Sequence, residues 1–142
     1  HGHTYLGHPT AAAAGVAVVN AMLDRSLIPR VKTQGDTLMA ALEAKFGQHP
    51  NVGDIRGRGL FQGVELVADR ATKAPFDASR KIAGRIKTAA FNAGLICYPM
   101  SGTIDGQNGD HVLLAPPFII SDDQIDELVS KLSVAIDTVL QS

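Results

Sequence analysis

The sequence predicts an α/β chain in which a small sheet of three to four strands is packed by helices and preceded by a long helix. Two observations carry this prediction. Apolar residues recur at helical spacing in several segments, and short β-branched runs bounded by glycine or proline lie between those segments. The 142 residues, 45% of them hydrophobic and 19% charged, have the composition of one soluble globular domain.

Two helices are expected in the first third of the chain. Pro9 suits the first position of a helix, and residues 10–27 contain no strong helix breaker. Ile28-Pro29 should break or kink the chain before a second helix over residues 31–46. The first helix is apolar on every side, which predicts burial on most sides.

Two further helices are expected later in the chain. The third should be capped by Asp77 or Ser79, present Phe91 on its apolar face and end at Gly94. Ser121 and Gln124 form a capping box, behind which a fourth helix with one apolar face should run almost to the end of the chain.

The strands are expected between these helices. Residues 52–67 read as two short strands around a glycine-rich turn, so a hairpin is the simplest interpretation. Residues 95–98 and 111–115 should form two more strands, separated by a turn-rich loop over residues 99–109.

The opening loop, residues 2–7, is the first candidate site. It precedes a helix amino terminus, where backbone N–H groups, a hydroxyl and the helix dipole can together hold a phosphate. As a pattern alone, it fits an ordinary helix cap better. His1, His3 and His8 are joined by no carboxylate or cysteine at ligand spacing, so no metal site is expected.

Arg56 and Arg58 lie two apart on an expected strand and should point to the same face. Their guanidinium groups could recognise a carboxylate or phosphate, although surface pairing with acids such as Asp54 is favoured. Asp105, Asp110 and His111 could serve in acid–base chemistry, but turn formation is favoured for them.

The charge and the hydropathy of the chain limit its possible partners. The net charge is −1 with both signs interspersed, which argues against nucleic acid. The longest apolar stretch, about residues 11–23, is too short to span a bilayer, so no membrane association and a cytoplasmic setting are expected. Two further features concern the chain itself. Cys97 lies in an apolar run and is interpreted as a buried, inert thiol. The absence of an initiator Met suggests a cut chain.

Three motifs occur in a familiar order: Gly2 to Pro9 with its alanine-rich helix, Val52 to Leu66, and Gly109 to Pro117. Together they resemble the class III aminotransferases, the ω-transaminase group. The resemblance covers essentially the whole chain, but it corresponds to only the last third or so of a typical family member.

The resemblance implies a fold-type-I enzyme that uses pyridoxal 5'-phosphate and works as a homodimer with active sites shared between subunits. Residues 1–8 would be the cofactor-phosphate loop at the end of the large domain, 9–34 a linking helix packed on by both domains, and 35–142 the carboxy-terminal small domain. The loop with His3 and Thr4 would reach across the dimer, so that Thr4 binds the cofactor phosphate of the partner subunit.

The small domain would form one wall of the substrate pocket, with Tyr98, Arg56 and Arg58 as candidate pocket residues. Many family members place a carboxylate-binding arginine where this sequence has Tyr98 or Leu113. Neither can make a bidentate contact, so carboxylate recognition must be weaker or come from elsewhere, for example Thr103 or Gln107.

No catalytic residue is expected in this chain. Its lysines fall on polar helix faces or loops, which do not depress a lysine pKa as a Schiff-base lysine requires. The resemblance therefore implies a parent enzyme that moves an amino group between an amine or amino acid and a keto acid, and an inactive isolated fragment. The alternatives are a stand-alone α/β ligand-binding or dimerisation module, or a related racemase or mutase.

Overall fold

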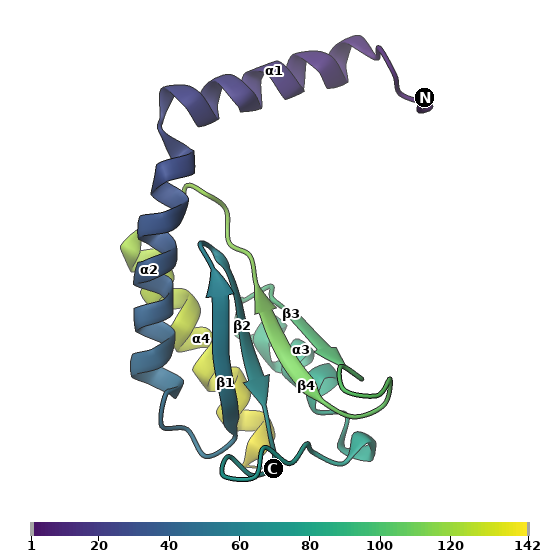
Figure 1. Cartoon of the computed structure of the whole chain (residues 1–142), viewed down its shortest axis with the longest axis vertical. Helices are drawn as coiled ribbons and strands as arrows, with labels where there is room; N and C mark the ends of the chain where they lie inside the picture. The colour runs from purple at the N-terminus through teal and green to yellow at the C-terminus, as the bar shows by residue number, and fades with distance from the viewer. Residues whose placement is uncertain (1, 142) are drawn as a thin grey trace.

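A computed structural model describes residues 2–141. A four-stranded sheet carries three helices on one side, and a further helix projects away from this body (Figure 1). The elements in chain order are α1 (Pro9–Asp24), α2 (Leu27–Phe46), β1 (Val52–Arg58), β2 (Phe61–Leu66), the 3-10 helix η1 (Ala78–Arg80), α3 (Ile82–Asn92), β3 (Tyr98–Ser101), β4 (Asp110–Leu114) and α4 (Asp122–Leu140).

The sheet has the order β1-β2-β4-β3, and every neighbouring pair is antiparallel. The expected hairpin over residues 52–67 is present as β1 and β2. The α/β prediction with a small sheet packed by helices is confirmed.

The hydrophobic core lies between one face of the sheet and the helices α2, α3 and α4. Alternate residues of β2 and β4 are buried, because successive side chains of a strand point to opposite faces. The helices contribute apolar stripes at a spacing of three or four residues. The largest fully buried apolar side chains are Leu38, Leu42, Phe46, Val52, Val64, Leu66, Ile82, Ile86, Leu114, Ile125, Leu132 and Ile136.

Close backbone contact fixes α2 against the hairpin. A Cβ atom added at Gly35 would lie 2.3 Å from the backbone carbon of Gly59, so the helix can approach the turn only through a glycine. One residue earlier, the buried Gln34 side chain donates to the carbonyl of Ile120 at 3.1 Å. These contacts join α2 to the hairpin and to the segment before α4.

The capping box of α4 is present as expected, with Ser121 accepting from the Gln124 N–H and the Gln124 side chain accepting from the Ser121 N–H. Gly94 ends α3 as expected: its N–H donates to the Phe91 carbonyl, and the next N–H, from Leu95, donates to that of Ala90, which is a Schellman motif.

Several sequence-based expectations for α3 and β3 are wrong in detail. Asp77 caps the short η1 and not α3, whose start is capped across the chain by Asp110, which accepts from the Ala83 N–H at 3.1 Å. Phe91 points away from the core and is 69% exposed. The third strand begins at Tyr98, where a strand over 95–98 was expected.

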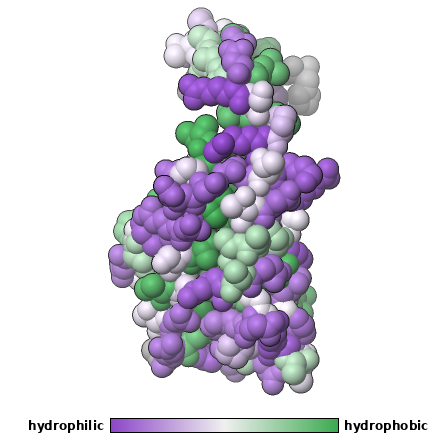
Figure 2. Space-filling model, turned by 90° about the vertical axis from the view of Figure 1, so that its left-hand side faces the viewer, coloured by the Kyte–Doolittle hydropathy of each residue, from purple (hydrophilic) through white to green (hydrophobic). Residues whose placement is uncertain are grey.

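Helix α1 is also different from its expectation. It ends at Asp24, and the turn falls at Ser26, which has a positive φ of 50° and precedes α2. Pro9 does occupy the first turn, as expected. However, none of the α1 residues is buried, and Figure 2 shows this helix standing apart from the body with hydrophobic side chains open on it.

Across residues 2–141, no single helix is long and apolar enough to cross a membrane. Taken as one segment, α1 and α2 together satisfy the length and composition of a span, but they are bent by 67° at their junction.

Candidate functional site

One face of the sheet is covered by none of the described helices, and we call it the open face (Figure 1). The strand register places Arg56, Gly63, Leu113 and Tyr98 in one row across all four strands of this face. Arg56 and Tyr98 are the end members of the row, on opposite edge strands, which separates their backbones by about 14 Å at the usual strand spacing. The structure therefore brings two of the three predicted pocket residues onto one surface.

Tyr98 is 64% exposed on this face. Its neighbour in the row is Leu113, with Gly63 next to Leu113. Because Gly63 has no side chain, the surface of the open face is depressed between Arg56 and Leu113.

A hollow of about 350 Å³ lies on the open face over this row, lined by Arg56, Gly63 and Leu113 but not by Tyr98. Arg56, Glu65 and His111 contribute polar groups to its wall, and Phe61 and Leu113 contribute apolar ones. Thr103 and Ile104 from the loop between β3 and β4 complete the wall. Of the two substitutes considered for the missing arginine, Thr103 therefore lies at the hollow, whereas Gln107 does not line it.

Arg56 is held by two carboxylates. One of its terminal nitrogens, Nη1, lies 2.5 Å from Glu65 Oε2 and 2.7 Å from Asp54 Oδ2. Hydrogen bonding to Glu65, then to Asp54, raises the pKa of the Arg56 guanidinium. The surface pairing that the sequence favoured is thus present, with Glu65 as a partner that the sequence analysis did not identify.

Arg58 lies elsewhere. It lines a separate groove of about 530 Å³ between the hairpin and α2, beside Val31 and Met39. The alternation of β1 places Arg56 and Arg58 on the same side of the strand, but the two guanidinium groups serve different hollows. The two guanidinium groups are therefore not placed to bind one carboxylate together.

The loop over residues 102–109 owes its shape to Asp105. Its Oδ1 accepts hydrogen bonds from the N–H groups of Gln107 at 2.9 Å and Asn108 at 2.7 Å, and its Oδ2 accepts from the Asn108 side chain. These bonds lower the Asp105 pKa to about 2. Asp105 therefore forms a turn, as expected, and holds Thr103 and Ile104 beside the hollow.

Asp110 and His111 have separate roles. Asp110 is buried beneath the sheet, where desolvation raises its pKa although the Ala83 N–H donates to it. Its role is to cap α3. His111 lies on the opposite, open face, directly across from Glu65 in the β2–β4 register.

The amino-terminal turn holds the predicted phosphate residues. The Leu6 N–H donates to the His3 carbonyl at 2.9 Å, which closes a turn around Thr4 and Tyr5. His8 caps α1 by accepting from the Ala11 N–H, so an ordinary helix cap is present and Thr4 is not part of it. Thr4 is exposed, and no acidic residue lies in the first turn of α1.

The turn with Thr4 and the open face of the sheet are far apart in the chain's structure, because α1 carries the turn away from the body (Figure 1). One chain therefore does not bring its own Thr4 to its own Tyr98.

The single cysteine of the chain, Cys97, is not placed for nucleophilic catalysis. The Cys97 thiol is half-buried, and burial raises its pKa, which disfavours the nucleophilic thiolate. Within residues 2–141, no three histidine, cysteine or acidic side chains gather as metal ligands; His1 of the predicted histidine set lies outside the described residues.

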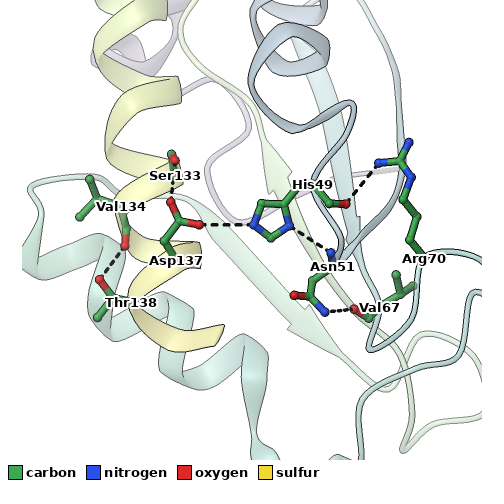
Figure 3. Close-up of polar contacts among 8 residues, drawn as sticks. All are labelled: His49, Asn51, Val67, Arg70, Ser133, Val134, Asp137 and Thr138. Carbon is green, nitrogen blue, oxygen red and sulfur yellow. Dashed lines mark hydrogen bonds and ion pairs between the residues drawn. The ribbon is translucent and has the colours of Figure 1, made fainter. Parts of the chain in front are cut away.

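A polar cluster of Ser133, Asp137 and His49 joins α4 to the connection between α2 and β1 (Figure 3). The carboxylate lies in the middle: Asp137 is 3.3 Å from His49 Nε2 and 3.1 Å from Ser133 Oγ. A nucleophilic serine needs the imidazole beside it, and here the Asn51 N–H donates to the remaining nitrogen, His49 Nδ1. The cluster ties elements together and is not a catalytic triad.

The fold and these surfaces define a small α/β domain with an open sheet face and, at the far end of α1, a separate exposed turn. The family model described as aminotransferase class-III matches residues 1–136. The chain belongs to the class III aminotransferase family, as its motifs predicted.

Relatives and solved structures agree with this assignment. An uncharacterised aminotransferase of Schizosaccharomyces pombe is 47% identical over 94% of this chain and 29% of its own length. The diaminobutyrate–2-oxoglutarate transaminase of Halomonas elongata is 32% identical over 98% of this chain and 28% of its own. The crystal structure of a transaminase from the marine bacterium Virgibacillus is 35% identical and superposes with a TM-score of 0.90, covering 99% of this chain and 31% of that one.

The chain thus spans less than a third of the length of these relatives. Most of the residues of a complete family member lie outside it.

Proposed function

We propose that this chain is the carboxy-terminal part of a pyridoxal-phosphate-dependent aminotransferase that moves an amino group between an amine or amino acid and a keto acid. The observation that carries the proposal is the family match over residues 1–136, joined to the presence of a substrate-sized hollow on the open face. The complete protein acts as a homodimer whose active sites are shared between subunits.

The turn around Thr4 fits the phosphate of the cofactor. It offers an exposed hydroxyl on a loop before a helix amino terminus, whose dipole favours an anion, and α1 has no carboxylate in its first turn to repel one. Since α1 holds this turn away from the chain's own sheet, Thr4, with His3 beside it, serves the cofactor of the partner subunit.

The open face of the sheet forms part of the substrate wall. Tyr98 offers an exposed phenol, and the hollow beside Arg56 offers room for the substrate's far end. Arg58, in its own groove next to α2, is the third candidate contact. Pyridoxal phosphate, when bound, supplies the ring that carries the amino group between the two substrates.

The lysine that holds the cofactor belongs to the rest of the protein. Lys32 and Lys131 of this chain pair with acidic residues one helical turn away, Asp36 and Glu127, and the Lys73 ammonium contacts the Gly53 carbonyl. Hydrogen bonding to Asp36 raises the pKa of Lys32, which favours the protonated form that is not nucleophilic. The isolated chain is therefore inactive.

The test is the visible absorbance of the complete protein mixed with excess pyridoxal phosphate and freed of unbound cofactor by gel filtration. We expect retained absorbance that changes when an amino donor is added. The isolated 142-residue chain, treated identically, is the control and should stay colourless. A complete protein that retains no cofactor would contradict the proposal.

A further inference from the structure

The charges around the hollow on the open face are unequal. Arg56 is the one guanidinium or ammonium group among the described residues that line it, and it pairs with Glu65 of the lining and with Asp54 beside it. Arg58, which lies across from Phe61 in the β1–β2 register, lines the separate groove beside α2. The remaining titratable group of the lining is His111, which lies opposite Glu65. Arg56, Glu65 and Asp54 together carry one net negative charge.

The Arg56 guanidinium already has two carboxylate partners. Both carboxylates contact the same Nη1 nitrogen, at 2.5 and 2.7 Å. Each of these ion pairs is part of a solvent-exposed surface and is individually weak. A substrate carboxylate would nevertheless become the third anion around one guanidinium, so it would be repelled by the pair already present.

The other described residues of the wall add no guanidinium or ammonium group. Phe61, Ile104 and Leu113 are apolar, and Thr103 adds a single hydroxyl. A hydrocarbon chain can pack against these side chains, and an ammonium group at its end would be attracted to Glu65. Charge and shape therefore agree on the kind of group that the hollow accepts.

We propose that this hollow receives the far end of the amino donor and selects donors that end in a cationic or apolar group over donors that end in a carboxylate. The inference rests on the proposed aminotransferase function. It assigns Glu65 as a specificity residue that acts both by its own charge and by occupying Arg56.

The experiment uses the complete enzyme loaded with pyridoxal phosphate, and three donors with a five-carbon chain: cadaverine, pentylamine and delta-aminovalerate. Initial rates of amino transfer to a common keto acid give kcat/KM for each donor at a pH of about 8, where an ordinary histidine is neutral. We expect kcat/KM for aminovalerate to be at least roughly tenfold below that for cadaverine, because like charges placed together suppress a wrong partner.

Glu65→Gln is the test variant. It removes one anion and frees part of Arg56, so the preference for cadaverine over aminovalerate should narrow severalfold. Glu127→Gln is the matched control: it makes the same change in an ion pair, 2.6 Å from Lys131, on α4 at the helix-covered side of the sheet, and should leave the preference unchanged. Asp54→Asn repeats the test if Glu65→Gln does not fold.

Two results would overturn the inference while leaving the proposed aminotransferase function standing. One is a higher kcat/KM for aminovalerate than for cadaverine, and the other is a ratio of these two kcat/KM values that neither Glu65→Gln nor Asp54→Asn alters. Absence of transfer from every donor would instead overturn the proposed function, and the inference with it.

Discussion

At the scale of single residues, Asp105 determines the shape of one wall of the hollow. Its carboxylate accepts from two successive backbone N–H groups and from the Asn108 side chain. The loop closes further through the Ile104 N–H, which donates to the Asn108 carbonyl at 3.0 Å. All of the side-chain bonds require the ionised carboxylate or are strengthened by it.

We predict that the Asp105 carboxyl group titrates at about 2, below its ordinary value of 3.8. A depressed folded-state pKa means that the carboxylate contributes stability above pH 3.8, and that this contribution is lost as the pH falls toward 2. Carboxyl-carbon NMR shifts of the 142-residue chain measure the midpoint. A midpoint near 3.8 would show that the loop bonds do not form.

Thr4 carries a second residue-scale prediction. In the complete protein, Thr4→Val should weaken pyridoxal phosphate binding by roughly ten- to hundredfold, since a hydrogen bond to a charged group contributes about 1.5–3 kcal/mol. Thr4→Ser, which keeps the hydroxyl, should bind almost normally. Thr37→Val, on an exposed part of α2 whose hydroxyl contacts only its own helix, is the control. Equal affinities for Thr4→Val and the control would exclude Thr4 from the phosphate site.

At the scale of elements, the contact between α2 and the hairpin depends on a missing side chain. Gly35→Ala should destabilise the domain by about 1–3 kcal/mol, because the added methyl group overlaps the Gly59 backbone. Gly84→Ala, inside α3 with open space around it, should instead stabilise by about 0.5–1 kcal/mol. Urea unfolding of the two variants measures both effects. Similar free energies of unfolding for the two would mean that the contact is not tight.

The sequence predicted those elements whose signals are local. The capping box of α4, the glycine that ends α3 and the hairpin all appear where their own residues indicate them. In contrast, the cap of α3 could not be predicted locally. Asp110 reaches the Ala83 N–H from 27 residues away, so only the folded sheet creates that bond.

The boundaries of α2 and β3 were predicted wrongly because each prediction treated a proline as the end of an element. Pro29 lies in the first turn of α2, where its missing N–H costs nothing, so the helix begins before it. Pro99 lies inside β3, which is tolerated because β3 is an edge strand whose outer side has no partner in this sheet.

The open face followed partly from sequence. Strand alternation correctly predicted that Arg56 and Arg58 share a side of β1, and Asp54 was recognised as a possible partner. The second ion pair with Glu65 depends on the register of the hairpin, and the hollow depends on a loop folding back from the far edge of the sheet. Neither depends on a local pattern.

At the scale of the whole molecule, α1 is the helix that lies apart from the core. It is apolar on every side, yet none of its residues is buried. Burial was expected from the composition, and the described residues do not provide it. The position between two domains that the family resemblance implies for this helix stays a prediction.

We predict that deleting residues 1–26 leaves the free energy of unfolding of the remaining domain within about 0.5 kcal/mol, as for other changes at exposed positions. The same deletion should reduce self-association of the isolated chain, because it removes a large exposed apolar surface. Urea unfolding and sedimentation velocity measure the two effects. Loss of folding on deletion would show that α1 supports the core.

The central claim is that Thr4 of one subunit serves the cofactor of the other, and hybrid dimers test it most directly. In the complete protein, a variant lacking the cofactor-binding lysine should be inactive, and a Thr4→Val variant should be impaired at low cofactor concentration. A mixed dimer of the two contains one site with both an intact lysine and an intact Thr4, provided that Thr4 acts across the interface. We predict that refolding the two variants together restores amino transfer at low cofactor concentration toward half of the wild-type level per mixed dimer. Activity no higher than that of the Thr4→Val protein alone would contradict the account.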